Sequence, residues 1–198
     1  MRTSVIKNPK VYSSNMYYIR GDWNKIDDVN TIIDPGMDDY IISAIIDIPS
    51  GIAKSKVEQV IITHEHFDHA SALKHIIEVY NPPKIIAFNL FKGVNIKAFD
   101  GMKIQLGDED AIIIHTPGHS QDSICIYALQ SKVLFSGDTP LFIKSHTSSF
   151  TKDYLDSLEK LTKLDINKIY PGHDEPITMY CNEIILKSYE IVKSSKII

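Results

Sequence analysis

The segment from His64 to His69, with the sequence HEHFDH, constrains this chain most, because it places three imidazoles and an aspartate within six residues. The cluster closely follows the apolar run Val60–Ile62. Alternate residues of an extended segment point the same way, so His64 and His66 can meet one cation while Asp68 and His69 turn toward a second. The pattern therefore predicts a strand that ends in a metal site.

Three short motifs further along the chain each place one metal-binding side chain after an apolar segment. Their sequences are TPGHS at residues 116–120, SGDT at residues 136–139 and YPGHD at residues 170–174. Glycine and proline favour turns, so His119, Asp138 and His173 are expected to project from turns. Together with the HEHFDH cluster, they predict one centre built from distant parts of the sequence.

These motifs, with Asp34 in the sequence IIDPG at residues 32–36, resemble the metallo-β-lactamase superfamily. The local sequences are most similar to its glyoxalase II branch, the hydroxyacylglutathione hydrolase-like proteins. The resemblance extends from about Val11 to Pro176. It implies an α/β fold, a four-layer αββα sandwich in which two mixed sheets pack face to face with helices outside, and residues 1–198 as a single metallo-β-lactamase-fold domain.

The resemblance also implies a role for each motif residue. The ligands of a first metal ion are expected to be His64, His66 and His119, those of a second Asp68, His69 and His173, with Asp138 bridging both. Asp68 is also expected to be catalytic, orienting the nucleophile and then carrying its proton to the leaving group. Asp34 is expected to fix a loop or a ligand without binding metal itself.

The residue types indicate hydrolytic chemistry, because structural zinc sites favour cysteine ligands and this set has none. Imidazole and carboxylate suit zinc first, with iron or manganese as alternatives, and the expected cofactor is two divalent ions. Metal coordination lowers the pKa of water from 15.7 to about 7, which supplies a hydroxide nucleophile. The predicted function is hydrolysis of a small thioester, ester or lactone. Two divalent ions, two carboxylates and one hydroxide leave a positive centre, which favours an anionic substrate.

An iron-dependent persulfide dioxygenase-like oxidoreductase on the same fold is the alternative, with a mononuclear site in the first histidine triplet plus the aspartate. That family carries an Arg-Thr-Asp-Phe segment after the metal aspartate, whereas residues 147–150 here read TSSF. A flavodiiron module would carry glutamate in place of His66. A non-catalytic member would have lost ligands, and this chain keeps them. His146, in the loop after Asp138, is a candidate residue of the substrate pocket.

Composition narrows the partners and the compartment. The 198 residues suit one large domain, and 43% of them are hydrophobic, enough for a core without disulfides. A formal net charge of −4 provides no basic field for nucleic acid. Two distant cysteines and the lack of a long apolar segment predict a reduced, cytoplasmic protein away from membranes. The expected partner is a small molecule.

Apolar patterning predicts alternating strands and helices. The expected strands span residues 11–20, 31–34, 57–63, 84–87, 111–115, 123–128, 133–136 and 168–170. The expected helices span residues 38–48, 70–79, 151–164 and 179–192. In the third helix, Tyr154, Leu155, Leu158, Leu161 and Leu164 form an apolar stripe, and Thr151 is placed to cap its start.

Overall fold

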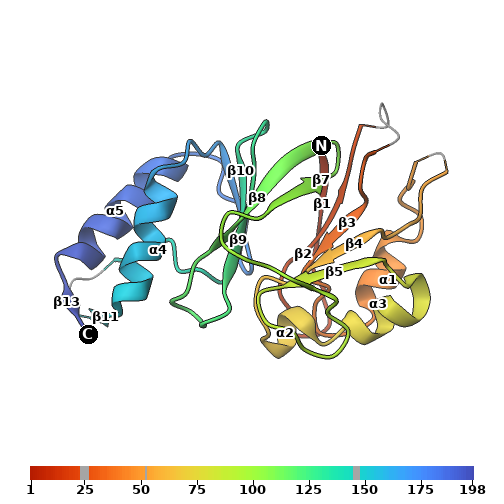
Figure 1. Ribbon diagram of the computed structural model, residues 1–198, viewed down its shortest axis with the longest axis horizontal. Coiled ribbons are helices and arrows are strands. Elements are labelled where there is room, and N and C mark those ends of the chain that lie inside the picture. The colour runs from red at the N-terminus through yellow and green to blue at the C-terminus, as the bar shows by residue number, and fades with distance from the viewer. Residues whose placement is uncertain (23–26, 52, 145–147) are drawn as a thin grey trace.

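The computed structural model describes residues 1–22, 27–51, 53–144 and 148–198. Its helices lie on the two outer sides and its two large sheets face each other between them (Figure 1). The predicted αββα sandwich is confirmed, because both large sheets are mixed and each is covered by helices on its outer face.

The first sheet has six strands in the order β1-β2-β3-β4-β5-β6. Its members are β1 (Arg2–Ile6), β2 (Met16–Arg20), β3 (Thr31–Ile33), β4 (Gln59–Ile61), β5 (Lys84–Ala87) and β6 (Ile96–Lys97). β1, β2 and β3 pair in antiparallel fashion, whereas β3 to β6 are parallel neighbours.

The second sheet has five strands in the order β12-β10-β9-β8-β7. Its members are β7 (Lys103–Leu106), β8 (Glu109–His115), β9 (Ile124–Ala128), β10 (Val133–Gly137) and β12 (Lys168–Pro171). Only the β10 and β12 pair is parallel. A small parallel pair, β11 (Ser149–Phe150) with β13 (Lys196–Ile197), lies apart from both sheets.

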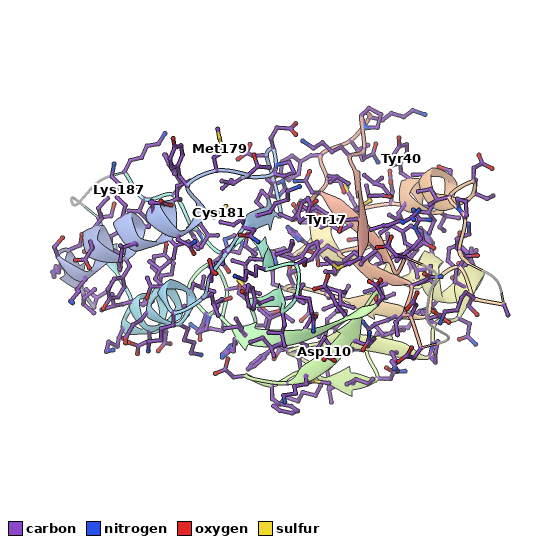
Figure 2. All side chains as sticks on the ribbon, turned by 90° about the horizontal axis from the view of Figure 1, so that it is seen from above. Tyr17, Tyr40, Asp110, Met179, Cys181 and Lys187 are labelled. Carbon is purple, nitrogen blue, oxygen red and sulfur yellow. The ribbon has the colours of Figure 1, made fainter. Side chains whose placement is uncertain are left out.

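The central strands are apolar on both faces because each face packs against a different layer. In β2, Tyr17 and Ile19 face the other sheet, while Met16 and Tyr18 face the helices α1 (Tyr40–Ile45) and α3 (Leu73–Tyr80). This alternation is the two-residue period of an extended chain. Figure 2 shows Tyr17 in the middle of the molecule. Burying each such side chain stabilises the fold by roughly 1.5–3 kcal/mol.

The helices α4 (Lys152–Thr162) and α5 (Cys181–Lys193) cover the second sheet. Thr151 caps α4 as predicted, since its side chain accepts a hydrogen bond from the Tyr154 backbone N–H. The expected stripe is buried at Tyr154, Leu158 and Leu161. Within the described residues, no helix is both long enough and apolar enough to cross a bilayer.

Three details of the predicted pattern were wrong. The strand expected over residues 11–20 begins only at Met16, and residues 11–15 lie in a loop before it. The helix expected over residues 70–79 is two helices, α2 (Phe67–Ala70) and α3, because the chain turns again after the histidine cluster. The strands β1, β6, β7, β11 and β13 were not predicted. β1 shows only weak apolar alternation, β6, β11 and β13 have two residues each, and β7 alternates but has only four residues. The single-domain organisation of residues 1–198 stays a prediction.

The topology brings several strand ends to one edge of the sandwich. β3 and β4 run parallel, and β8, β10 and β12 run in a common direction through their pairing with β9 and with each other. The two sheets meet at this edge, where the Ile124 N–H donates to the Thr63 carbonyl at 2.9 Å. All the motifs singled out in the sequence follow these strand ends.

Candidate metal centre

Each candidate ligand stands in a turn that follows a strand or, for Asp68 and His69, in the short helix α2 just beyond one. His64 to His69 follow β4, His119 follows β8, Asp138 directly follows β10 and His173 follows β12. Backbone hydrogen bonds join these turns, including Gly172 N–H to the Gly137 carbonyl at 2.7 Å. The fold thus brings together residues that are more than a hundred positions apart in the chain.

Three histidines form the first donor group. His64, His66 and His119 each offer a nitrogen, and these nitrogens all lie within 4.8 Å of one another. His66 Nδ1 and His119 Nε2 are 3.0 Å apart. His64 is buried, while His66 is exposed and the His119 side chain is 28% exposed. The sequence predicted this triplet, and the structure brings it together.

Asp68, His69 and His173 form the second donor group, again with donor atoms within 4.8 Å. His173 Nε2 lies 3.1 Å from Asp68 Oδ2, and His69 Nε2 lies 3.8 Å from the same oxygen. Asp68 and His69 are buried. These are the same three residues that were predicted from the sequence for the second ion.

Asp138 lies between the two groups. Its Oδ2 is 3.9 Å from His64 Nε2 and 3.6 Å from His119 Nε2, on the side of the first group. The same oxygen is 3.5 Å from His173 Nε2, and Oδ1 is 3.3 Å from His69 Nε2, on the side of the second. A carboxylate in this position can contact both groups at once, which is what a bridging ligand requires.

The centre contains buried polar atoms that have no hydrogen-bond partner within the described parts of the chain. They are His64 Nε2, His69 Nε2 and Asp138 Oδ1. An unpaired buried polar group costs about 1–3 kcal/mol, so such atoms need a partner. All three point into the donor groups, and a set of imidazoles and carboxylates without thiolate suits a divalent cation. The residues present therefore fit the metal ions that the sequence implied.

Asp34 supports the buried side of the centre. It follows β3 with a positive φ of 52°, a conformation that aspartate tolerates better than most residues. Its carboxylate accepts from Thr63 N at 2.8 Å and Thr63 Oγ1 at 2.7 Å, and it lies 2.8 Å from His69 Nδ1. This contact leaves His69 Nε2 turned toward the centre, the arrangement in which a second residue orients a ligating histidine.

Asp122 supports the more open side. Its Oδ2 accepts from the Glu65 N–H at 2.8 Å, next to His64 and His66 in the chain. Its Oδ1 accepts from Ser120 Oγ at 2.7 Å, next to His119. One half-buried carboxylate thus joins the two turns that carry the first donor group.

Gly172 is required because the chain passes very close to the centre. A Cβ atom at this position would lie 2.0 Å from Asp138 Oδ1 and 2.8 Å from His69 Cε1. No real side-chain carbon approaches other atoms so closely, so only glycine lets the His173 turn pack against Asp138. This contact explains the glycine of the YPGHD motif.

Burial and neighbouring charges shift the pKa values of the two buried histidines, His64 and His69, in opposite directions. Desolvation and the nearby His69 lower the pKa of His64 to about 4. Desolvation opposes charge on His69 as well, but the carboxylates of Asp34 and Asp138 outweigh it and raise the pKa of His69 to about 10. Burial alone would raise the pKa of Asp138, yet His69 and the other histidines hold it below its usual range. In the metal-free centre, His69 therefore holds its proton to a much higher pH than His64 does.

A hollow of about 460 Å³ opens beside the donor atoms, a suitable size for a small molecule. His119, Asp138 and His173 line its reactive end, residues 140–142 with Ile177 form an apolar side, and Asp174 and Glu175 add polar groups. His146, the predicted pocket residue, lies outside the described residues. Thr63, Asp122 and Tyr12 were not predicted as site residues, because their contacts with the centre arise only from the fold.

Several known proteins are similar to this chain. The hydroxyacylglutathione hydrolase of Francisella tularensis subsp. novicida is 38% identical over 135 residues, covering 62% of this chain and 52% of the relative. The chain thus matches about half the length of that protein. ETHE1 from Myxococcus xanthus has the same fold, with a TM-score of 0.68 at 22% identity over 97% of this chain and 88% of its own.

An archaeal metallo-β-lactamase superfamily protein from Sulfolobus tokodaii aligns with a TM-score of 0.66 at 16% identity, covering 95% of this chain and 84% of its own. At such identities the two structures show the fold alone. The sequence pattern of the metallo-β-lactamase superfamily, however, matches residues 9–87 and 86–173, which include every donor residue of the centre. The chain therefore belongs to the metallo-β-lactamase superfamily.

Proposed function

We propose that this protein is a metal-dependent hydrolase of a small thioester, ester or lactone. One observation carries the proposal: seven donor side chains converge in two groups of three, linked by a third group of Asp138 with His64 and His69, and buried donor atoms are left unpaired at their centre. His64, His66 and His119 would hold one divalent ion, Asp68, His69 and His173 the other, and Asp138 both. When bound, such ions lower the pKa of a coordinated water toward 7 and polarise a carbonyl oxygen.

Asp68 is the residue best placed to move a proton. Its side chain is only 8% exposed, and its Oδ2 faces His173 Nε2 and His69 Nε2 across the second donor group. From there the carboxylate can accept a proton from the attacking water and pass it to the leaving group. Because its environment is nearly dry, the proton is not readily lost to bulk solvent.

The hollow beside the centre would orient the substrate. Asp138, His119 and His173 form its reactive end, and Leu141 and Phe142 offer apolar surface further out. A carbonyl at the reactive end with an apolar acyl group along that wall would satisfy both surfaces. The relatives named hydroxyacylglutathione hydrolase support thioester hydrolysis as the reaction class. An anionic substrate and a cytoplasmic setting remain part of the proposal.

The persulfide dioxygenase-like alternative uses a single iron held by the first histidine triplet and Asp138. It leaves no role for the donor group of Asp68, His69 and His173. The completeness of that second group favours hydrolysis. A glutamate in place of His66, typical of a flavodiiron module, is also missing from this sequence.

The decisive experiment is elemental analysis of anaerobically purified protein together with an activity panel. The panel contains thioesters, lactones, phosphodiesters and glutathione persulfide. We expect two metal ions per chain and turnover of a thioester or lactone. One iron per chain with oxygen uptake on the persulfide would favour the alternative, and metal-free protein with no turnover after reconstitution would refute both.

The variant Asp68→Asn tests the division of roles. It keeps the size of the side chain but removes its ability to take up the proton. We expect turnover to fall by about 10²-fold or more, since proton transfer by a positioned group typically contributes 10²–10⁴-fold. Metal content at the first site should stay as in the parent protein. Loss of both ions in this variant would show that Asp68 is chiefly structural.

A further inference from the structure

Tyr12 stands over the candidate centre although no sequence motif contains it. Its ring stacks on the imidazole of His173, with centroids 5.2 Å apart and planes inclined by 20°. Its hydroxyl lies 3.4 Å from His173 Nε2. The residue is nevertheless 67% exposed, so the ring shields His173 on one face and meets solvent on the other. A large aromatic side chain in such a position is available to a bound molecule.

The loop that carries Tyr12 is fixed to the centre. Ser14 N–H donates to the Asp68 carbonyl at 3.1 Å, and Asn15 N–H donates to the Gly172 carbonyl at 2.6 Å. Ser13 Oγ accepts from the Met37 N–H at 3.1 Å. Ser14 and Asn15, which follow Tyr12 closely in the chain, are therefore anchored to the segments that carry Asp68 and His173. Tyr12 is held in place by its backbone while its side chain stays open to solvent.

The hydroxyl of Tyr12 approaches the nitrogen that faces the second donor group. His173 Nε2 is also 3.1 Å from Asp68 Oδ2 and 3.5 Å from Asp138 Oδ2. If this nitrogen binds a cation, as proposed above, its lone pair is no longer available to the phenol. The hydroxyl is then a hydrogen-bond donor beside the reactive end of the hollow, without its former partner.

An open recess of about 480 Å³ continues from this hydroxyl. It shares His173 and Asp174 with the apolar-walled hollow but lies toward the loop of Tyr12. Its lining includes the polar side chains of Lys7, Asn8 and Asn15 beside Val11 and the Tyr12 ring, and Asn15 Nδ2 donates to the Asp174 carbonyl at 2.8 Å. The recess therefore offers polar groups that the Leu141 and Phe142 side of the first hollow lacks, and the two hollows meet at His173 and Asp174.

We propose that Tyr12 contacts the substrate, its hydroxyl donating a hydrogen bond to an acceptor atom of a polar leaving group that lies in this recess. The proposal rests on the hydrolase function proposed above and assigns the two parts of the substrate to the two hollows. The acyl part lies along Leu141 and Phe142, and the leaving group lies beside Tyr12. Tyr12 thereby favours substrates whose leaving thiol or alcohol carries polar groups.

The test uses the thiol N-acetylcysteamine as a leaving-group probe and its acetyl thioester as a substrate. Binding of the thiol to the zinc-loaded protein is measured by calorimetry, and metal content by elemental analysis. Tyr12→Phe keeps the stacking and removes the hydroxyl, so binding should weaken about two- to tenfold, the value of one hydrogen bond. Tyr12→Ala should weaken it further. Tyr180→Phe is the matched control, because Tyr180 is 69% exposed and lies outside both hollows.

Each outcome has a distinct meaning. Weaker binding in Tyr12→Phe, with metal content unchanged and Tyr180→Phe equal to the parent protein, supports the proposal even if the thioester is not turned over. In that case only the hydrolase function would fail. Equal binding in Tyr12→Phe and the parent protein, or no binding of the thiol to either, would overturn the proposal. Loss of metal in Tyr12→Phe would make Tyr12 a support of His173 and would overturn it as well.

Discussion

The inner and outer parts of the candidate centre are held in different ways. The inner part, His64 and His69, is buried and rests on Asp34 and Thr63, with His69 showing no exposure at all. The outer part, His66, His119 and His173, is accessible, and His66 and His119 lie against each other at 3.0 Å. Hydrogen bonds therefore hold the inner ligands in place before a metal ion binds, whereas the outer ligands remain accessible to ions and substrate.

The largest effect is expected from Asp138→Ala, because Asp138 lies within 4 Å of histidines from both donor groups, His64 and His119 on one side and His69 and His173 on the other. Bound metal should fall below one ion per chain, and hydrolysis should fall by more than the roughly 10–100-fold that loss of a supporting residue costs. Elemental analysis and steady-state kinetics measure both. Asp165→Ala, at a carboxylate that is 67% exposed and pairs with Lys132, is the control. Unchanged metal in Asp138→Ala would contradict the bridging role.

Asp34→Ala should be the next most damaging change, through the inner part alone. It leaves Thr63 N–H and His69 Nδ1 buried without their acceptor, and breaking such a buried pair costs about 3–5 kcal/mol. Metal affinity should fall about 10–100-fold. Denaturant unfolding of the metal-free protein and competition with a chelator measure the two effects. Asp34→Asn suits the positive φ and keeps one oxygen, so it should lose less stability and less metal affinity. Equal unfolding free energies for Asp34→Ala and the parent protein would refute the supporting role of Asp34.

The inner part should also set the pH dependence of the metal-free protein. Between pH 6.5 and about 10 the folded chain keeps a proton on His69 that the unfolded chain has lost, so stability falls as pH rises through this window. Between pH 6.5 and about 4 the unfolded chain takes a proton that folded His64 refuses, so stability falls as pH falls. The unfolding free energy should therefore peak near pH 6.5.

Unfolding titrations in chelator at several pH values would measure this peak. The unfolding free energy should fall by at least about 1 kcal/mol between pH 6.5 and pH 9, since one pKa unit corresponds to 1.36 kcal/mol. In Asp34→Asn this fall should be smaller, because Asp34 is the main group that raises the pKa of His69. A stability that rises steadily from pH 6.5 to pH 9 would disprove the charge assignment.

The inner and outer parts also differ in what the sequence could predict. All seven donor residues were predicted because histidine and aspartate in turns after apolar runs form a compact local signal, and the structure brings every one of them together. Their roles as ligands stay a prediction. Asp34 was predicted from its own motif, but Thr63, Asp122 and Tyr12 were not. Their partners lie up to 161 positions away, and none of the three belongs to a motif with a metal-binding side chain.

The same reasoning explains which strands were found. β5 was predicted with its correct bounds because it is continuously apolar after its first residue and buried. β1 alternates weakly and buries only Ile6, so pairing with β2 rather than its own composition makes it a strand. Tertiary contacts decide the conformation of such segments. Sequence patterns therefore predicted the core of the sandwich better than its edges.

The smallest effect is expected from Asp122→Ala, which tests the outer part. Asp122 joins the turn of His66 to the turn of His119 through Glu65 N–H and Ser120 Oγ. Because the carboxylate is half-buried and solvent can replace it, its loss should cost about 1 kcal/mol of stability. Metal affinity should fall by no more than about tenfold, at the low end for a supporting residue. The same chelator competition measures it beside Asp34→Ala. Equal loss of metal affinity in Asp122→Ala and Asp34→Ala would contradict this ranking. The outer ligands would then be held as firmly as the inner ones, and the two parts would differ only in their accessibility to solvent.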